Sequence, residues 1–294
     1  MAKATTYSQR AGLEQCYAAA SVAVDRALRG DDSLFTTGVP IWSPEVIDDL
    51  YRRFVDKPDQ SSDHFEVKFR RQLAGAPDRT IQLAGELLYF HFLIALDISG
   101  QTKRGLINEV LSWAQQPVTI PEELAEALDG GFMSTGIAFK TYRPNQLWFL
   151  LDFLRAWKLL DGTKRGHMLD DAWAFKAFVW ELPIKAAQSQ REGLLHLVHP
   201  ETFEDTVSRE YKRKIVEAFS NEDTQLSDDV DRDLALIRAK LENEAGHPIN
   251  FYASPYVEQW KPLEPSPEPE AKGKRVWLVR GSNVDGRNLV PEWL

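Results

Sequence analysis

One short segment of the chain carries an acid and a lysine at the spacing of a metal-dependent nuclease. Glu66 and Lys68 are separated by one residue and follow Asp63. On a β-strand, residues i and i+2 project from the same side, so such a pair could bind Mg²⁺ and act on a phosphodiester. The flanking apolar residues recur at helical intervals instead, and on a helix positions i and i+2 diverge by about 200°. We therefore expect a helix here and keep a nuclease acting through Glu66 and Lys68 as an alternative.

Two histidines lie at a spacing that could hold a metal ion. His196 and His199 are three residues apart, and Glu192 precedes His196 by about one helical turn. Imidazole and carboxylate groups suit Zn²⁺, but a structural site needs about four ligands and no further one is evident nearby. Pro200 ends the helix, so we expect both histidines to bond free carbonyl oxygens near its C-terminal end. We therefore predict no metal and no cofactor.

Other titratable residues lie on the most apolar segment of the chain. His91 stands among aromatic residues and is expected to be a hydrogen-bonded core residue. Glu86 and Asp97 would be costly to bury alone, and we expect Glu86 to pair with Arg79 or Arg104. The sequence has no GxxxxGK(S/T) or GxGxxG phosphate loop and no Gly-x-Ser-x-Gly nucleophile motif. We therefore predict no catalytic residue, and we expect that this chain is not an enzyme.

The charge of the chain argues against a surface that is basic throughout. Its formal net charge is −9, which repels the phosphates of nucleic acid. Two local groups of basic residues could still contact DNA phosphates, and the alternative is that they are solvated helix faces balanced by nearby acids. They are Lys68, Arg70 and Arg71 in one group and Arg209, Lys212, Arg213 and Lys214 in the other.

The elements that would position these residues are helices. Apolar residues recur at helical intervals as far as residue 262, which predicts an all-α, multi-helix globular domain over residues 1–262. A soft boundary is expected near residue 130, and the sequence allows a short extended segment over residues 136–142. The most apolar helix begins at Pro77–Asp78 and is expected to be central and buried. The other expected helices cover 9–29, 103–114, 121–128, 146–160, 172–182, 190–198, 209–219 and 228–245, and two more begin at Ser43 and Ser62.

The composition changes after residue 262. Residues 263–274 are rich in Pro and Glu and are expected to form an extended, solvated linker. Residues 275–294 open with a short apolar run and a turn, which predicts the first strand and loop of a truncated β-containing domain. We therefore expect the chain to be the front portion of a larger protein. No signal peptide or membrane span is recognisable and the single cysteine, Cys16, excludes an internal disulfide, so we expect a cytoplasmic protein.

Four stretches of the chain share a pattern with one protein family. They are QLAGAPDRTIQLAGELLYFHFLIAL at 72–96, LLHLVHPETFEDTVSREYKRKIVEAF at 194–219, DVDRDLALIRAKLENEAGHPINFY at 229–252 and RVWLVRGSNVDGRNLVPEWL at 275–294. The first three resemble helical segments in the N-terminal regions of large bacterial McrB-like AAA+ NTPases of modified-DNA (type IV) restriction systems. The last is similar to the first strand and loop of a PUA/EVE-like domain that such proteins carry before their motor.

This resemblance implies an accessory role. Family members combine a specificity domain, an AAA+ GTPase and a partner nuclease, whereas this chain ends before any nucleotide-binding motif. The implied function is a non-catalytic module that contacts the rest of a larger polypeptide, an AAA+ motor or its nuclease partner, or that positions DNA. The resemblance also implies that Trp277, Ser282 and Asn283 edge a pocket for a modified base and that Arg280 contacts nucleic acid; the alternative for Trp277 is packing in a hydrophobic core. The alternatives are a stand-alone helical scaffold and the nuclease described above.

Overall fold

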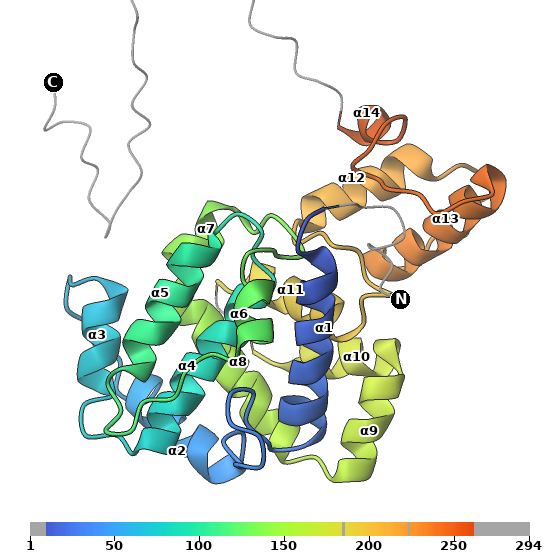
Figure 1. Ribbon diagram of the computed structural model, residues 1–294. Helices are drawn as coiled ribbons and strands as arrows, with labels where there is room; N and C mark the ends of the chain where they lie inside the picture. Colours follow the sequence, from blue (N-terminus) through green and yellow to red (C-terminus); the bar gives the residue numbers. More distant parts are fainter. Residues whose placement is uncertain (1–9, 184–185, 223, 262–294) are drawn as a thin grey trace, which may run out of the picture. The chain divides into compact units, whose positions relative to one another are not determined.

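The computed structural model describes residues 10–183, 186–222 and 224–261, and this part of the chain is all-α (Figure 1). The prediction of an all-α fold is thereby confirmed. Within these residues no strand is formed, and a single bridge pairs Ala95 with Met133. The described residues up to Trp260 form one compact unit. The linker expected at 263–274 and the strand expected in 275–294 lie outside the described residues.

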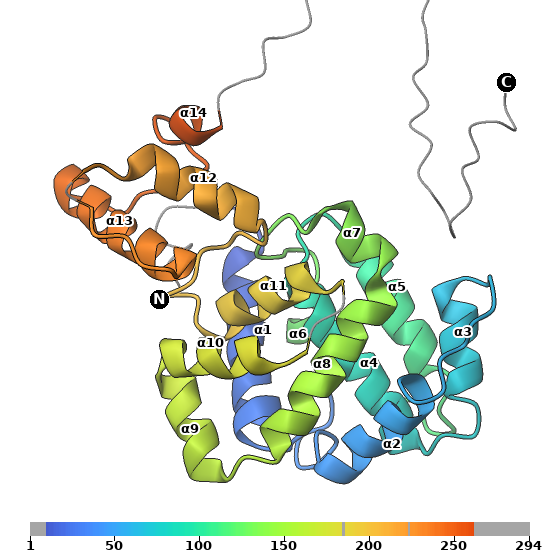
Figure 2. The same cartoon turned by 180° about the vertical axis from the view of Figure 1, so that it is seen from behind.

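Fourteen α-helices and one π-helix, η2, make up the described chain (Figures 1 and 2). Their bounds are α1 Leu13–Ala23, η2 Val24–Arg29, α2 Pro44–Phe54, α3 Phe65–Gln72, α4 Asp78–Leu93, α5 Gly100–Leu111, α6 Glu122–Ala127, α7 Gly136–Thr141, α8 Arg143–Lys158, α9 Gly162–Asp170, α10 Ala172–Glu181, α11 Gln188–Val198, α12 Arg209–Phe219, α13 Val230–Ala245 and α14 Val257–Trp260.

Helix α4 occupies the centre of the larger hydrophobic core, as predicted from its apolar circumference. Every residue from Thr80 to Leu93 is buried. Helices α1, α2, α5 and α8 pack around it (Figure 1). A helix that is apolar on all sides must be covered on all sides, because exposed apolar surface is costly in water. This core extends along the chain from Leu13 to Phe203.

A second, smaller hydrophobic core lies in the C-terminal helices. Helix α12 packs against α13 and α14. The shared apolar cluster contains Ile215, Leu234 and Trp260. The apolar packing therefore divides between Phe203 and α12. Across Gly130–Gly131, where the sequence suggested a soft boundary, the larger core is continuous through Ala127, Phe132 and Met133.

Three local elements differ from the expectations. Residues 136–142 are not extended, because Gly136 to Thr141 form helix α7. The carboxylate of Asp97 accepts hydrogen bonds from the backbone N–H groups of Thr135 and Gly136, both at 3.1 Å, and so satisfies donors at the start of this helix. Helices α9 and α14 were not predicted, since each is short and α9 is polar on most of its surface. None of the helices that the structure describes has the length and apolarity needed to cross a bilayer.

Candidate functional site

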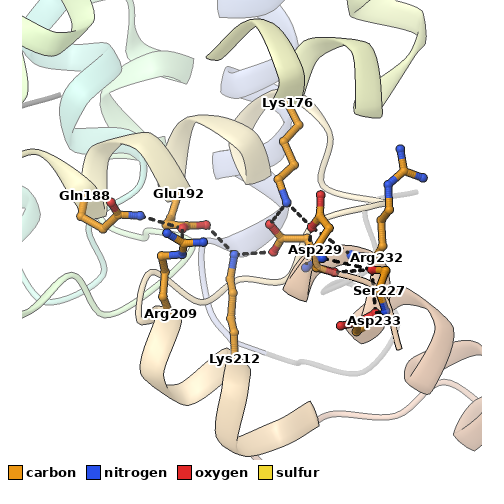
Figure 3. A network of polar contacts seen from close by, with 10 residues as sticks. Lys176, Gln188, Glu192, Arg209, Lys212, Ser227, Asp229, Arg232 and Asp233 are labelled. Carbon is orange, nitrogen blue, oxygen red and sulfur yellow. Dashed lines mark hydrogen bonds and ion pairs between the residues drawn. The ribbon is translucent and has the colours of Figure 1, made fainter. Parts of the chain in front are cut away.

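A chain of alternating acids and bases forms the most concentrated polar site of the described residues (Figure 3). It lies where α10 and α11 of the larger core meet α12 and the start of α13. Three carboxylates and three cations alternate along it, so their formal charges cancel. In order, they are Asp229, Lys176, Asp231, Lys212, Glu192 and Arg209. We call these six residues the polar junction.

Lys212 is the centre of the polar junction. Its side chain is 1% exposed, and its Nζ lies 2.6 Å from Glu192 Oε2 and 2.7 Å from Asp231 Oδ1. Burial alone would lower the pKa of Lys212, but the attraction of the two carboxylates outweighs it and holds the pKa above its ordinary value. The amine is therefore an ammonium at neutral pH, and its two carboxylate partners come from α11 and α13.

The start of α13 supplies two of the three acids of the polar junction, Asp229 and Asp231. Asp229 is the N-cap of α13, and its Oδ1 accepts the backbone N–H of Asp231 at 3.0 Å. Lys176 of α10 binds Asp231 Oδ2 at 2.6 Å and also contacts Asp229 Oδ1. Burial raises the pKa of Asp231, but the attraction of Lys212 and Lys176 lowers it by more than burial raises it. The pKa of Asp231 is therefore below its ordinary value.

Two tryptophans of α10 border the polar junction. Trp173 and Trp180 lie two helical turns apart, with Lys176 between them and its Nζ 5.9 and 5.1 Å from the two ring centroids. The guanidinium of Arg232 lies 4.2 Å above Trp173, and that of Arg191 lies 4.5 Å above Trp180. Arg191 also donates to three carbonyl oxygens at the C-terminal end of α10. On this face of α10, Lys176 is thus held between the rings of Trp173 and Trp180.

The protonation states of the polar junction suit structure better than acid–base chemistry. A general acid or base works best with a pKa near the working pH. Here the ammonium of Lys212 is driven to a higher pKa and the carboxyl of Asp231 to a lower one. Both side chains are also shielded from water, with Lys212 1% and Asp231 2% exposed. The junction can hold helices together, and no reacting group is free at it.

The expected helix around Glu66 and Lys68 is confirmed, because both residues lie on α3. At i and i+2 of a helix the two side chains diverge, so the strand geometry of a metal-dependent nuclease is not present. Glu66 Oε1 instead lies 3.4 Å from the guanidinium of Arg143. No group of three or more His, Cys, Asp or Glu side chains within the described ranges is placed to hold a metal ion.

The histidines bond to carbonyl oxygens, although not those of their own helix end. His196 Nδ1 lies 2.9 Å from the Phe203 carbonyl oxygen, and its Nε2 lies 2.7 Å from the Tyr17 hydroxyl. Because Nδ1 must donate to a carbonyl, Nε2 accepts the Tyr17 proton. His199 Nε2 lies 3.0 Å from the Met168 carbonyl oxygen. His91 is a buried core residue as expected, 2.6 Å from Gln190 Oε1.

Glu86 has partners other than the expected arginines. Its carboxylate is fully buried and accepts from the Ser33 hydroxyl, the Leu34 backbone N–H and the Trp42 indole N–H at 2.5–2.8 Å. Gln82 and the Phe35 backbone N–H donate to it as well. The expectation of a pair with Arg79 or Arg104 is therefore wrong. Burial raises the pKa of Glu86, while these hydrogen bonds oppose the rise.

The structure separates the basic residues proposed to contact DNA into free and neutralised ones. Lys68 is half-buried and Arg70 is exposed on α3, whereas Arg71 pairs with Asp59 at 2.8 Å and with Asp63. Arg213 is exposed on α12. Lys214 pairs with Glu210 at 2.7 Å, and Arg209 lies 3.7 Å from Glu192. Lys212 is a correction: it is buried between two carboxylates and has no face toward a phosphate. Trp277, Arg280, Ser282 and Asn283 lie outside the described residues.

The polar junction itself was not predicted as a unit. One signal for it was present: Lys212 lies one turn before Ile215 and Val216, which face the smaller core, so it shares the apolar side of its helix. Lys176 likewise lies between Trp173 and Trp180 at helical spacing. Searches with the chain returned no matching family model, no matching curated protein and no matching solved structure.

Proposed function

We propose that the helical part of this chain is a non-catalytic accessory module that works by contact with a partner protein. The partner class is the one implied by the resemblance to McrB-like restriction systems, an AAA+ motor or its nuclease. One observation carries the choice of protein over DNA. The central cation of one basic group, Lys212, and one cation of the other, Arg71, are each bound by two acids of the same fold.

Electrostatics supports this choice. Affinity for duplex DNA depends on cations that replace the counterions of the phosphates. Each of the two groups retains few cations for that role, and Arg70 and Arg213 are their exposed members without an ion pair within the described residues. Those two stand on a chain with a net charge of −9. Weak DNA positioning by α3 is therefore the second candidate, favoured by Arg70 and Lys68.

A titration of the full chain with labelled duplex DNA at low ionic strength distinguishes the two candidates. We expect no saturable binding, and no change when Arg70→Glu or Arg213→Glu is introduced. Arg52→Glu serves as the matched control, because Arg52 is exposed and already pairs with Asp49 at 3.4 Å. Binding that Arg70→Glu or Arg213→Glu abolishes and Arg52→Glu leaves intact would establish DNA positioning instead.

The positive test concerns the partner. We expect an AAA+ NTPase to be encoded in the same open reading frame or beside it, and the purified chain to bind that NTPase stoichiometrically in calorimetry. The NTPase should retain its nucleotide hydrolysis without the helical part, since an accessory module supplies no reacting group. An NTPase that ignores the chain, or the lack of any such gene, contradicts the proposal and favours the stand-alone scaffold.

A further inference from the structure

The C-terminal helices α12, α13 and α14 have the properties of a separate folding unit. They surround their own apolar cluster, which includes Ile215, Leu234 and Trp260. The cluster of the larger core ends at Phe203. The segment before α12 belongs with these helices, because Glu204 is bound on both carboxylate oxygens by Arg238 of α13 and both side chains are buried. Asp205 still lies 3.8 Å from Arg10 and Val207 still packs against the larger core, so the hinge lies within residues 204–208, before α12.

The contacts that join this unit to the larger core are mainly ionic. Lys212 of α12 reaches Glu192 of α11 at 2.6 Å, and Asp231 of α13 reaches Lys176 of α10 at 2.6 Å. Figure 3 shows Lys212 and Glu192 pointing toward one another, and Lys176 pointing toward Asp229. Around them lie Arg209 against Glu192 and Arg232 against Trp173. The joint is thus a set of paired charges between two apolar cores.

Separation at such a joint differs from separation of an apolar interface. Pulling apart two apolar faces exposes surface that water disfavours, at about 25 cal/mol for each Å². Pulling apart two ion pairs returns the ions to water, and their hydration offsets much of the lost attraction. The joint can therefore open at a lower free energy than the unfolding of either core.

The charged groups of the joint keep some favourable contacts when it opens. Lys212 remains bound to Asp231, because both belong to α12–α13. Glu192 retains the amide of Gln188 at 2.8 Å on α11. Lys176 retains the faces of Trp173 and Trp180. Glu192 and Lys176 do lose their ion-pair partners, but undocking removes the helices that cover them, so water can hydrate both charges.

We propose that α12, α13 and α14 form an electrostatic latch, a folded helical unit that undocks from α10 and α11 while both apolar cores stay intact. Undocking bares the face of α10 that carries Trp173, Lys176 and Trp180. This inference does not depend on the proposed function. It assigns a role to the polar junction, which joins the two apolar cores through the pairs Lys212–Glu192 and Lys176–Asp231.

The test measures a distance across the joint in the full chain. Spin labels are placed at Leu159→Cys, which is 88% exposed at the end of α8, and at Lys240→Cys, which is exposed on α13, in a Cys16→Ala background. Pulsed electron paramagnetic resonance then reports the distance distribution. Lys176→Met removes both ion pairs that α10 makes with α13, and we expect it to raise the population of a second, longer distance at least about tenfold.

Two further variants keep the result interpretable. Glu192→Gln weakens the other bridge and should produce the same second distance, which covers the case that Lys176→Met does not fold. Lys158→Met is the matched control, because it removes another buried lysine, one that binds Asp31 and two carbonyl oxygens away from the joint. It should leave the distance distribution unchanged.

Hydrogen exchange on the same variants decides whether the unit stays folded. Amides of α13 and of α4 should keep their protection in Lys176→Met, because undocking breaks no helical hydrogen bond. A single unchanged distance in both junction variants would overturn the latch, since the joint would then be rigid. Loss of α13 protection together with the second distance would overturn it as well, because the unit would be unfolding and not undocking.

Discussion

Replacing the buried Lys103 should have opposite effects on stability at neutral and at alkaline pH. This α5 lysine is 0% exposed, and its Nζ donates to the Gly130 carbonyl oxygen at 2.5 Å. No carboxylate among the described residues forms an ion pair with it. Burial lowers the pKa of Lys103 from 10.5 to about 8. We predict that Lys103→Met stabilises the protein at neutral pH and destabilises it at alkaline pH.

The magnitude follows from the difference between the folded and unfolded pKa. Each pKa unit corresponds to about 1.4 kcal/mol, so a lysine whose pKa falls from 10.5 to about 8 costs the folded state about 3 kcal/mol while it is protonated. Between pH 8 and 10.5 the unfolded state binds more protons than the folded state, so wild-type stability rises with pH across this window. Methionine removes that cost but leaves the Gly130 carbonyl without a donor, a loss of about 1–2 kcal/mol.

We therefore expect Lys103→Met to raise the free energy of unfolding by about 1–2 kcal/mol at pH 7 and to lower it by a similar amount near pH 10.5. Urea unfolding of both proteins, followed by circular dichroism at each pH, measures it. Lys158→Met is the comparison. Burial lowers the pKa of Lys158 to about 8 as well, but its loss leaves Asp31 and the carbonyl oxygens of Ala27 and Gly30 without this donor, contacts of 2.5–2.6 Å, so it should destabilise at both pH values and more strongly near pH 10.5. If Lys103→Met destabilises equally at both, burial of this ammonium is not the dominant cost and the reasoning fails.

Three further substitutions test the packing around the larger core by urea unfolding. Glu86→Gln should cost about 2–4 kcal/mol, because it turns an amide N–H₂ toward groups that all donate to the present carboxylate. Gly131→Ala should cost about 1–3 kcal/mol or more, since a Cβ there would lie 2.5 Å from backbone atoms of Ala95 that cannot move aside. Tyr17→Phe removes the donor to His196 Nε2 and should lower the free energy of unfolding by about 1–2 kcal/mol. For each of the three variants, an unchanged urea midpoint would contradict the contact that the variant tests.

Elements with a long apolar period were predictable from the sequence. The expected range of α12 matches the observed helix, and α4 is central and buried as its circumference indicated. Both features could be predicted because helical periodicity involves only residues close together in the sequence. Residues 136–142 were harder, because the start of α7 is held by the side chain of Asp97, 38 residues away from Thr135.

The states of charged side chains depended on contacts distant in sequence. Lys212 stands in a run of basic residues that looks solvated, but Glu192 and Asp231 meet it from 20 and 19 residues away. Glu86 was expected to need a cation, and the fold supplies donors from residues 33–42 instead, including backbone N–H groups that no side-chain pattern reveals. The sequence thus indicates that a buried charged group needs a partner, but only the tertiary structure shows which residues are its partners.

Three buried lysines show how surroundings decide what an ammonium does in this fold. Lys103 has a carbonyl oxygen for a partner, Lys158 has two carbonyl oxygens and Asp31, and Lys212 has two carboxylates. Burial lowers the pKa of the first two to about 8, whereas the two carboxylates raise that of Lys212. Lys212 is the lysine of the three whose charge its surroundings stabilise on balance. One of its two acids lies on its own side of the joint, so the ammonium can leave the α11 face without being left uncompensated.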